Sequence, residues 1–238
     1  HKSSPQMELN SIFEFTTSFP LMKENVDSYN TIEPKISLRI NPGDMNNYSS
    51  TQRTITNGNI FNIDRLGLGN VYEAGKSITL GLNYRKEKIE DINKYFEMKV
   101  ATVMRDVEEN RIPTSSTINR KNSNLFGTVN YNMSEFLSLN YNIALDNDFE
   151  TIEYNSLGTI ITFDNLITEF NFIEENGEMG NTNSYDIKTE YNFNENNFLS
   201  FKTRRNRNIN LTEYYDLIYE YKNDCLTAGI KYKKTYYE

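Results

Sequence analysis

The stretch Leu137-Ser138-Leu139-Asn140-Tyr141-Asn142-Ile143-Ala144-Leu145 alternates between two kinds of side chain. Its odd-numbered positions are apolar or aromatic, and its even-numbered positions are small or polar. Successive side chains of a β-strand point to opposite faces, so the stretch predicts a strand with one apolar and one polar wall. The same two-residue rhythm returns along most of the chain, which indicates an all-β fold.

About a dozen segments share this rhythm, too many strands for a small soluble core. They are predicted at Glu8–Phe19, Lys35–Asn41, Ser77–Lys86, Tyr95–Arg105, Asn124–Asn132, Phe136–Leu145, Glu150–Phe163, Leu166–Ile173, Ser184–Phe193, Phe198–Asn206, Thr212–Tyr221 and Leu226–Tyr236. In a membrane barrel only one face of each strand meets lipid, which produces this alternation. We therefore expect an antiparallel transmembrane β-barrel, with residues 1–238 forming a single barrel segment.

The predicted linkers alternate in length. Residues 42–76 and 106–123 are long, whereas 133–135 and 164–165 are short. Antiparallel neighbours joined in this way place short turns at one rim and long loops at the other, as in bacterial outer-membrane barrels. We expect the short turns to be periplasmic and the long loops extracellular. The exception is Pro20–Pro34, a long segment on the short-turn side.

The alternation also assigns side chains to two walls. The apolar wall, which includes Leu80, Leu82 and Val129, is assigned to lipid. The polar wall must face water, and ten of its residues are predicted to line a lumen: Glu97, Lys99, Asn130, Asn140, Asn142, Lys188, Glu190, Lys202, Glu220 and Lys231. Lys35, Arg39 and Asp186 belong to the same wall. Because Lys or Arg at the lipid midplane costs about 2 to 4 kcal/mol, a register shift of one residue would be strongly unfavourable.

Composition excludes several classes of protein. The hydrophobic share of 37% and mean hydropathy of −0.69 reflect a chain without any run of about 20 apolar residues, so membrane-spanning helices are not expected. A net charge of −8 argues against nucleic-acid binding. The single histidine, His1, removes His-based catalytic triads and most zinc sites. We predict no catalytic, cofactor-binding or metal-binding residues, and so a protein that is not an enzyme.

Closure of the barrel leaves two interpretations. In hydrocarbon every backbone amide must be paired within the protein, so a sheet has to close. About twelve strands could close alone as a porin-like channel. The first predicted strand, Glu8–Phe19, alternates irregularly, and no obvious closing strand is found near Tyr236. Both observations favour the interpretation that the chain forms part of a larger barrel.

Three stretches resemble one family of outer-membrane proteins. The first is Ser18-Phe19-Pro20-Leu21 with Ile32-Glu33-Pro34-Lys35-Ile36; the second runs from Asn59-Ile60-Phe61-Asn62-Ile63-Asp64-Arg65-Leu66-Gly67 through Glu73-Ala74-Gly75-Lys76 to Tyr84; the third is Tyr221-Lys222-Asn223-Asp224-Cys225-Leu226. Together they resemble the C-terminal barrel of the lipopolysaccharide-assembly LptD (OstA) family.

The resemblance implies a function and a set of partners. It implies a Gram-negative outer-membrane protein that inserts lipopolysaccharide into the outer leaflet and contacts membrane lipid. An LptE-like lipoprotein would plug the lumen, and an LptA-like periplasmic bridge would deliver lipopolysaccharide through an N-terminal periplasmic domain. That domain and the strands of the lateral seam are expected to lie outside this chain, which would supply the C-terminal half of the barrel.

Cys225 is the only cysteine. In an exported protein it would be either unpaired and inert or bonded to a partner outside the chain. The linker count places it at the short-turn rim. The resemblance implies a disulfide to the periplasmic domain, but Leu226 stands where many members carry a second cysteine, so at most one such bond is expected from this segment.

The long loop after Asn41 carries a second candidate motif. Its glycines Gly67, Gly69 and Gly75 do not form a dinucleotide fingerprint, and turn chemistry accounts for most of them. Asp64 and Arg65 are interpreted either as a buried ion pair that folds the loop inward or as a solvated surface pair. The resemblance favours the inward fold over the lumen.

Overall fold

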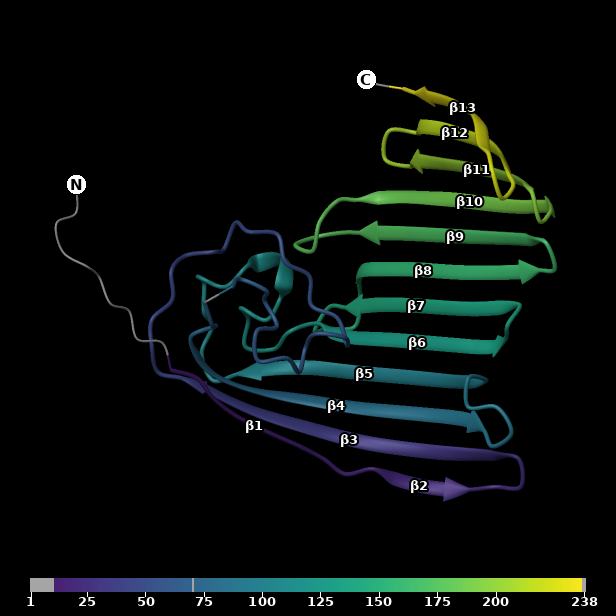
Figure 1. The fold of residues 1–238 in the computed structure, drawn as a ribbon. Coiled ribbons are helices and arrows are strands. Elements are labelled where there is room, and N and C mark those ends of the chain that lie inside the picture. The colour runs from purple at the N-terminus through teal and green to yellow at the C-terminus, as the bar shows by residue number, and fades with distance from the viewer. Residues whose placement is uncertain (1–10, 70, 237–238) are drawn as a thin grey trace.

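The computed structural model describes residues 11–69 and 71–236, which form a sheet of thirteen antiparallel strands (Figure 1). The strands are β1 (Phe13–Ser18), β2 (Leu21–Glu24), β3 (Ser28–Asn41), β4 (Gly75–Lys88), β5 (Tyr95–Arg105), β6 (Leu125–Ser134), β7 (Leu137–Leu145), β8 (Ile152–Phe163), β9 (Leu166–Glu175), β10 (Asn183–Asn194), β11 (Asn197–Asn206), β12 (Leu211–Lys222) and β13 (Thr227–Thr235). One short 3-10 helix, η1 (Thr114–Ser116), interrupts the loop after β5. None of the described helices is long and apolar enough to cross a membrane.

The strands follow one another through the sheet in the order of the sequence. From β3 to β13 each strand pairs with the next, while β1 and β2 both pair with β3. The prediction of an all-β antiparallel sheet is therefore confirmed. Within the described residues β13 does not pair with β1, so the sheet is not closed. The part of the first predicted ribbon before residue 11 lies outside the described residues.

The prediction that Pro20–Pro34 is a long linker is wrong. Leu21–Glu24 forms β2, and β3 begins at Ser28, so only residues 25–27 make the turn. Pro34, which lacks an N–H, concealed this strand pattern. The Phe19 N–H donates to the Pro34 carbonyl at 3.0 Å, so the proline nitrogen faces the break between β1 and β2 and β3 loses no bond to β4.

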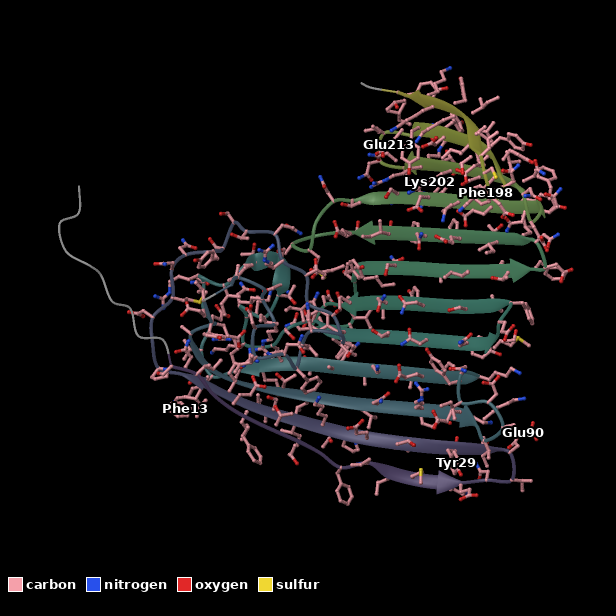
Figure 2. The ribbon with its side chains drawn as sticks, in the orientation of Figure 1. Phe13, Tyr29, Glu90, Phe198, Lys202 and Glu213 are labelled. Atoms are coloured by element: carbon pink, nitrogen blue, oxygen red, sulfur yellow. The ribbon has the colours of Figure 1, made fainter. Side chains whose placement is uncertain are left out.

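With this correction the two longest connections lie at the same end of the sheet, although 207–210 at that end is no longer than 223–226 at the other. One end of the sheet carries the short turns at 25–27, 89–94, 135–136, 164–165, 195–196 and 223–226; the other carries 42–74, 106–124, 146–151, 176–182 and 207–210. Figure 2 shows Tyr29 and Glu90 at the short-turn end and Phe13 at the long-loop end. The predicted placement of the long loops 42–74 and 106–124 at one end is confirmed, whereas connections of four to six residues occur at both ends. The orientation of the two ends across a membrane stays a prediction.

Register separates the two faces of the sheet. Residues paired across neighbouring strands share a face, and one such row runs from Lys35 through Gly81, Ala101 and Phe126 to Ala144. We call the face that contains this row the polar face, because it also carries Glu97, Lys99 and Asn130. The other face, called the apolar face, carries many exposed hydrophobic side chains. They include Phe15, Leu38, Leu82, Met98, Tyr131, Leu217, Tyr219 and Ile230.

The hydrophobic core lies at the long-loop end, between loops and sheet. The loops contribute Met45, Ile55, Ile60, Leu66, Ala74, Ile112, Ile118 and Met179, and the polar face contributes Ala101, Val103, Phe126 and Ala144. Figure 1 shows the loops gathered over one side of the curved sheet near β3 to β7. The hydrophobic core therefore lies between the long loops and one face of a single sheet, and not between two packed sheets.

Candidate functional site

Two long loops fold together into one unit, which we call the loop cap (residues 42–69, 71–74 and 106–124). Backbone and side-chain bonds join the two segments: Tyr48 N–H to the Arg111 carbonyl at 2.8 Å, Thr114 N–H to the Ser49 carbonyl at 3.1 Å, and Arg53 N–H to Ser115 Oγ at 2.8 Å. These bonds satisfy loop backbone groups that the sheet does not reach. The cap is thus an ordered layer rather than a set of separate loops.

The loop cap is fixed to the polar face by a packed ring and an amide. A Cβ placed on Gly81 would lie 2.6 Å from Cζ of Phe61, so only glycine lets this ring rest on β4. Asn57 Nδ2 donates to the Phe126 carbonyl at 3.1 Å and to Thr128 Oγ1 at 3.2 Å, both on β6. The loop therefore folds onto the polar face, as the family resemblance implied.

Arg65 is the centre of the attachment to β4. It is buried and donates to both carboxylate oxygens of Glu73, with an Nε–Oε2 distance of 2.9 Å. It also donates to Thr79 Oγ1 at 2.9 Å and to Ser77 Oγ at 3.1 Å. The Arg65 guanidinium therefore links two positions of the same loop, 65 and 73, and also links the loop to β4.

Two further arginines surround the same carboxylate. Arg39 Nη1 lies 3.5 Å and Arg105 Nη1 lies 3.4 Å from Glu73 Oε1. Arg39 also pairs with Glu14 Oε2 on β1 at 2.5 Å. Burial alone would raise the pKa of Glu73, but the charges of Arg65, Arg39 and Arg105 and the bond from Arg65 lower it to about 2.

The interpretation of Asp64 and Arg65 as an ion pair is wrong, because Arg65 pairs with Glu73 instead. The Oδ1 atom of Asp64 is buried and accepts no hydrogen bond from the described residues. The guanidinium fork can meet both oxygens of a carboxylate that the following turn brings back to it. Adjacency in the sequence favours Asp64 as the partner of Arg65, whereas the folded turn brings Glu73, the first residue of the Glu73-Ala74-Gly75 motif, to the guanidinium.

The three motif glycines occupy left-handed backbone conformations. Their φ angles are +60° at Gly67, +75° at Gly69 and +88° at Gly75. A Cβ at Gly75 would also lie 2.9 Å from Nη2 of Arg105. Turn geometry explains all three glycines, and the arginine cluster adds a second requirement at Gly75.

All ten residues predicted to line a lumen lie on the polar face, as the pairing of neighbouring strands shows. Glu97, Asn130, Asn140 and Asn142 form a chain across β5 to β7. The links are Asn130 Nδ2 to Glu97 Oε2 at 2.9 Å, Asn140 Nδ2 to Asn130 Oδ1 at 2.5 Å, and Asn142 Nδ2 to Asn140 Oδ1 at 2.7 Å. That this face borders a lumen stays a prediction.

Most of the charged residues in this predicted set form ion pairs. Lys99 Nζ lies 2.9 Å from Glu97 Oε2, Lys188 Nζ lies 2.9 Å from Glu190 Oε1, and Lys231 Nζ lies 3.2 Å from Asp216 Oδ2. Lys202, labelled in Figure 2, is exposed on β11, and Glu220 is half-buried on β12. The structure thus separates the predicted set into a group on β5 to β7 and another on β10 to β13.

This arrangement supports noncovalent contact with hydrated or charged molecules. It offers amides, hydroxyls and paired charges on an open polar surface. Within residues 11–69 and 71–236 no three His, Cys, Asp or Glu side chains gather in a way that could hold a metal ion.

Cys225 lies in the turn between β12 and β13, at the short-turn end. It is exposed, and its backbone N–H donates to Asn223 Oδ1 at 3.0 Å. The linker count placed it at this rim correctly. Its oxidation state and partner stay predictions.

The family model described as LPS transport system D, LptD, matches residues 2–197. The chain belongs to the LptD family. The LptD match runs from before β1 to the first residue of β11, so it includes the loop cap and the arginine cluster but ends before Cys225. The resemblance inferred from sequence motifs is confirmed. A comparison with curated proteins finds no match.

Membership of the LptD family implies lipopolysaccharide transport and assembly at the outer membrane. LptD proteins are transport and assembly proteins and are not known as enzymes. Lipopolysaccharide is accordingly the molecule with which this family works.

Proposed function

We propose that this chain forms part of the wall of a transmembrane β-barrel that inserts lipopolysaccharide into the outer leaflet of the outer membrane. The observation that carries the proposal is the division of one continuous sheet into an apolar and a polar face. Exposed hydrophobic side chains such as Leu38, Leu82 and Tyr219 need an apolar solvent, and lipid provides it.

The sheet formed by the described residues has two unpaired edges, and these support a barrel larger than this segment. The hydrogen-bonding groups on the free sides of β1 and β13 would each cost several kcal/mol if left unsatisfied in hydrocarbon. Further strands, including those of a lateral seam, therefore complete the wall. Residues 1–238 then act as a single barrel segment, together with an N-terminal periplasmic domain.

Orientation and partners follow from the sorted connections. The short turns are periplasmic and the loop cap is extracellular, as in outer-membrane barrels generally. An LptE-like lipoprotein occupies the lumen beside the polar face of β9 to β13, strands that contribute no described residue to the hydrophobic core. An LptA-like bridge delivers lipopolysaccharide to the periplasmic domain, and Cys225 bonds to a cysteine of that domain.

A spin-label scan along Leu137–Leu145 tests the membrane wall. Labels at odd positions are expected to be reached by oxygen dissolved in lipid, and labels at even positions by a water-soluble nickel chelate. The scan uses the protein in outer-membrane vesicles. If labels at Leu139 and Tyr141 are reached by neither reagent, the apolar face is packed against protein and the proposal is wrong.

A conductance measurement distinguishes the wall segment from a self-contained porin-like channel. The purified chain is added to a planar bilayer. Absence of stable channels agrees with a sheet that needs further strands, whereas uniform open channels would show that these strands close by themselves.

A further inference from the structure

A cavity of about 240 Å³ lies between the loop cap and the polar face. Asn57 and Phe61 of the cap line one side, and Gly81 and Asn83 of β4 line the other. The cavity exists because Phe61 rests on a glycine and holds the cap against the sheet. It lies beside the arginine cluster and is separate from it, since none of the three clustered arginines lines it.

Two lysines flank this cavity from the strands on either side of β4. Lys35 comes from β3 and Lys99 from β5. Lys35 Nζ lies 4.5 Å from the centre of the Phe61 ring and, among the residues that the structure describes, makes no ion pair. Lys99 shares its charge with Glu97 at 2.9 Å. One ammonium group is therefore held over an aromatic ring without an anion of its own.

The same cavity also offers hydrogen-bond acceptors. Asn83 Oδ1 is buried and accepts no bond within the described part of the chain. Glu33, whose side chain can also accept hydrogen bonds, is another lining residue of the cavity. A buried acceptor without a donor costs roughly 1 to 3 kcal/mol, so a hydroxyl group that donates to Asn83 would be favoured.

We propose that this cavity binds one acidic sugar residue, with its anionic group beside Lys35 and Lys99 and its hydroxyls donating to Asn83 and Glu33. The two chemistries are complementary: among the described residues Lys35 has no anionic partner and Asn83 Oδ1 has no hydrogen-bond donor. The site gives the proposed transport function a polar contact for the saccharide part of its substrate. Binding is measurable in detergent without transport, so its failure and the failure of the membrane proposal are distinguishable.

Isothermal titration of the full chain in detergent tests the site with defined probes. Glucose 6-phosphate and glucuronate carry both chemistries, inorganic phosphate carries the anion alone, and glucose carries the hydroxyls alone. We expect the two acidic sugars to bind at least tenfold more tightly than either single-chemistry probe. No heat from the acidic sugars, or inorganic phosphate binding as tightly as glucose 6-phosphate, would overturn the proposal.

Variants then locate the binding. Lys35→Gln is expected to weaken glucose 6-phosphate binding at least tenfold, and Lys35→Arg, which keeps the charge, to retain it within about threefold. Lys76→Gln on the opposite face of β4 is the matched control and should leave binding unchanged. Circular dichroism verifies that each variant keeps the sheet. An equal loss in Lys76→Gln, or none in a folded Lys35→Gln protein, contradicts the assignment.

Discussion

Arg65 and Glu73 form a two-pronged ion pair at the base of the loop cap, in a place from which water is almost excluded. Their side chains are 1% and 3% exposed. Isolated buried charges are costly, so the pair depends on the surrounding hydroxyls of Ser77 and Thr79 and on the neighbouring guanidiniums. Through Arg65, this pair attaches the loop to β4.

Replacing Glu73 by Gln should release the cap. The change leaves three arginines without their shared carboxylate, and breaking a buried pair in this way costs about 3 to 5 kcal/mol. Hydrogen exchange of residues 42–74 measures the loosening, with residues 227–235 of β13, which contribute nothing to the hydrophobic core, as an internal reference. Unchanged exchange in the loop would show that packing alone holds it.

Acid should produce the same loosening in the unaltered protein. The folded-state pKa of Glu73 is about 2 and its ordinary value is 4.5, so its stabilisation is complete above pH 4.5 and disappears as the pH falls towards 2. The shift corresponds to about 3 kcal/mol. Exchange measured between pH 5 and 2 should increase in the native loop, while the Glu73→Gln protein lacks this component.

Gly75→Ala should destabilise the cap more than Gly67→Ala. Both residues have positive φ, which costs an alanine on the order of 1 to 2 kcal/mol. Only at Gly75 does the new Cβ also meet Arg105, at 2.9 Å, whereas nothing lies within 4 Å at Gly67. Proteolysis of the cap compares the two; equal rates would mean that Arg105 moves aside without cost.

Lysine at neighbouring positions of β6 should have opposite consequences. Val129 lies on the apolar face and Asn130 on the polar face. At the lipid midplane Val129→Lys is expected to cost about 2 to 4 kcal/mol, whereas Asn130→Lys remains in water. Urea unfolding in lipid vesicles measures both. Similar losses for the two variants would contradict a lipid-facing apolar wall.

Cys225 reports the orientation of the sheet. A membrane-impermeant maleimide added to intact cells should not label it if the short turns are periplasmic, and labelling should appear once the outer membrane is permeabilised and disulfides are reduced. A cysteine introduced at Asp44, 94% exposed at its side chain in the cap, should react from outside. Reversed labelling would invert the proposed orientation.

The alternation of side chains was sufficient to predict twelve of the thirteen described strands, their order and the end of the sheet at which the two longest loops lie. A period of two assigns faces directly, and register follows because neighbouring strands are joined by tight turns. The strand around Pro34 was missed because a proline usually marks a strand edge, and here its missing donor coincides with the gap between β1 and β2. The alternation of neighbouring side chains therefore predicts strands correctly wherever the backbone pairing is regular.

The loop cap could not be predicted in the same way. Its contacts depend on turns at Gly67 and Gly69 and on arginines from β3 and β5, which are distant in sequence. The motif pointed to the right loop, but the partner of Arg65 was wrong because only the folded turn returns Glu73 to it. The acidic-sugar cavity likewise requires three strands and a loop to meet.

The placement of the hydrophobic core has a mechanical consequence. Strands β4 to β7 are braced at one end by packed side chains, whereas β13 is exposed along its whole length and relies on its ladder with β12. Such a sheet is stiff on one flank and compliant on the other. Heat or tension applied to this segment should therefore peel it hairpin by hairpin from the β13 flank, leaving the capped strands as the last to separate.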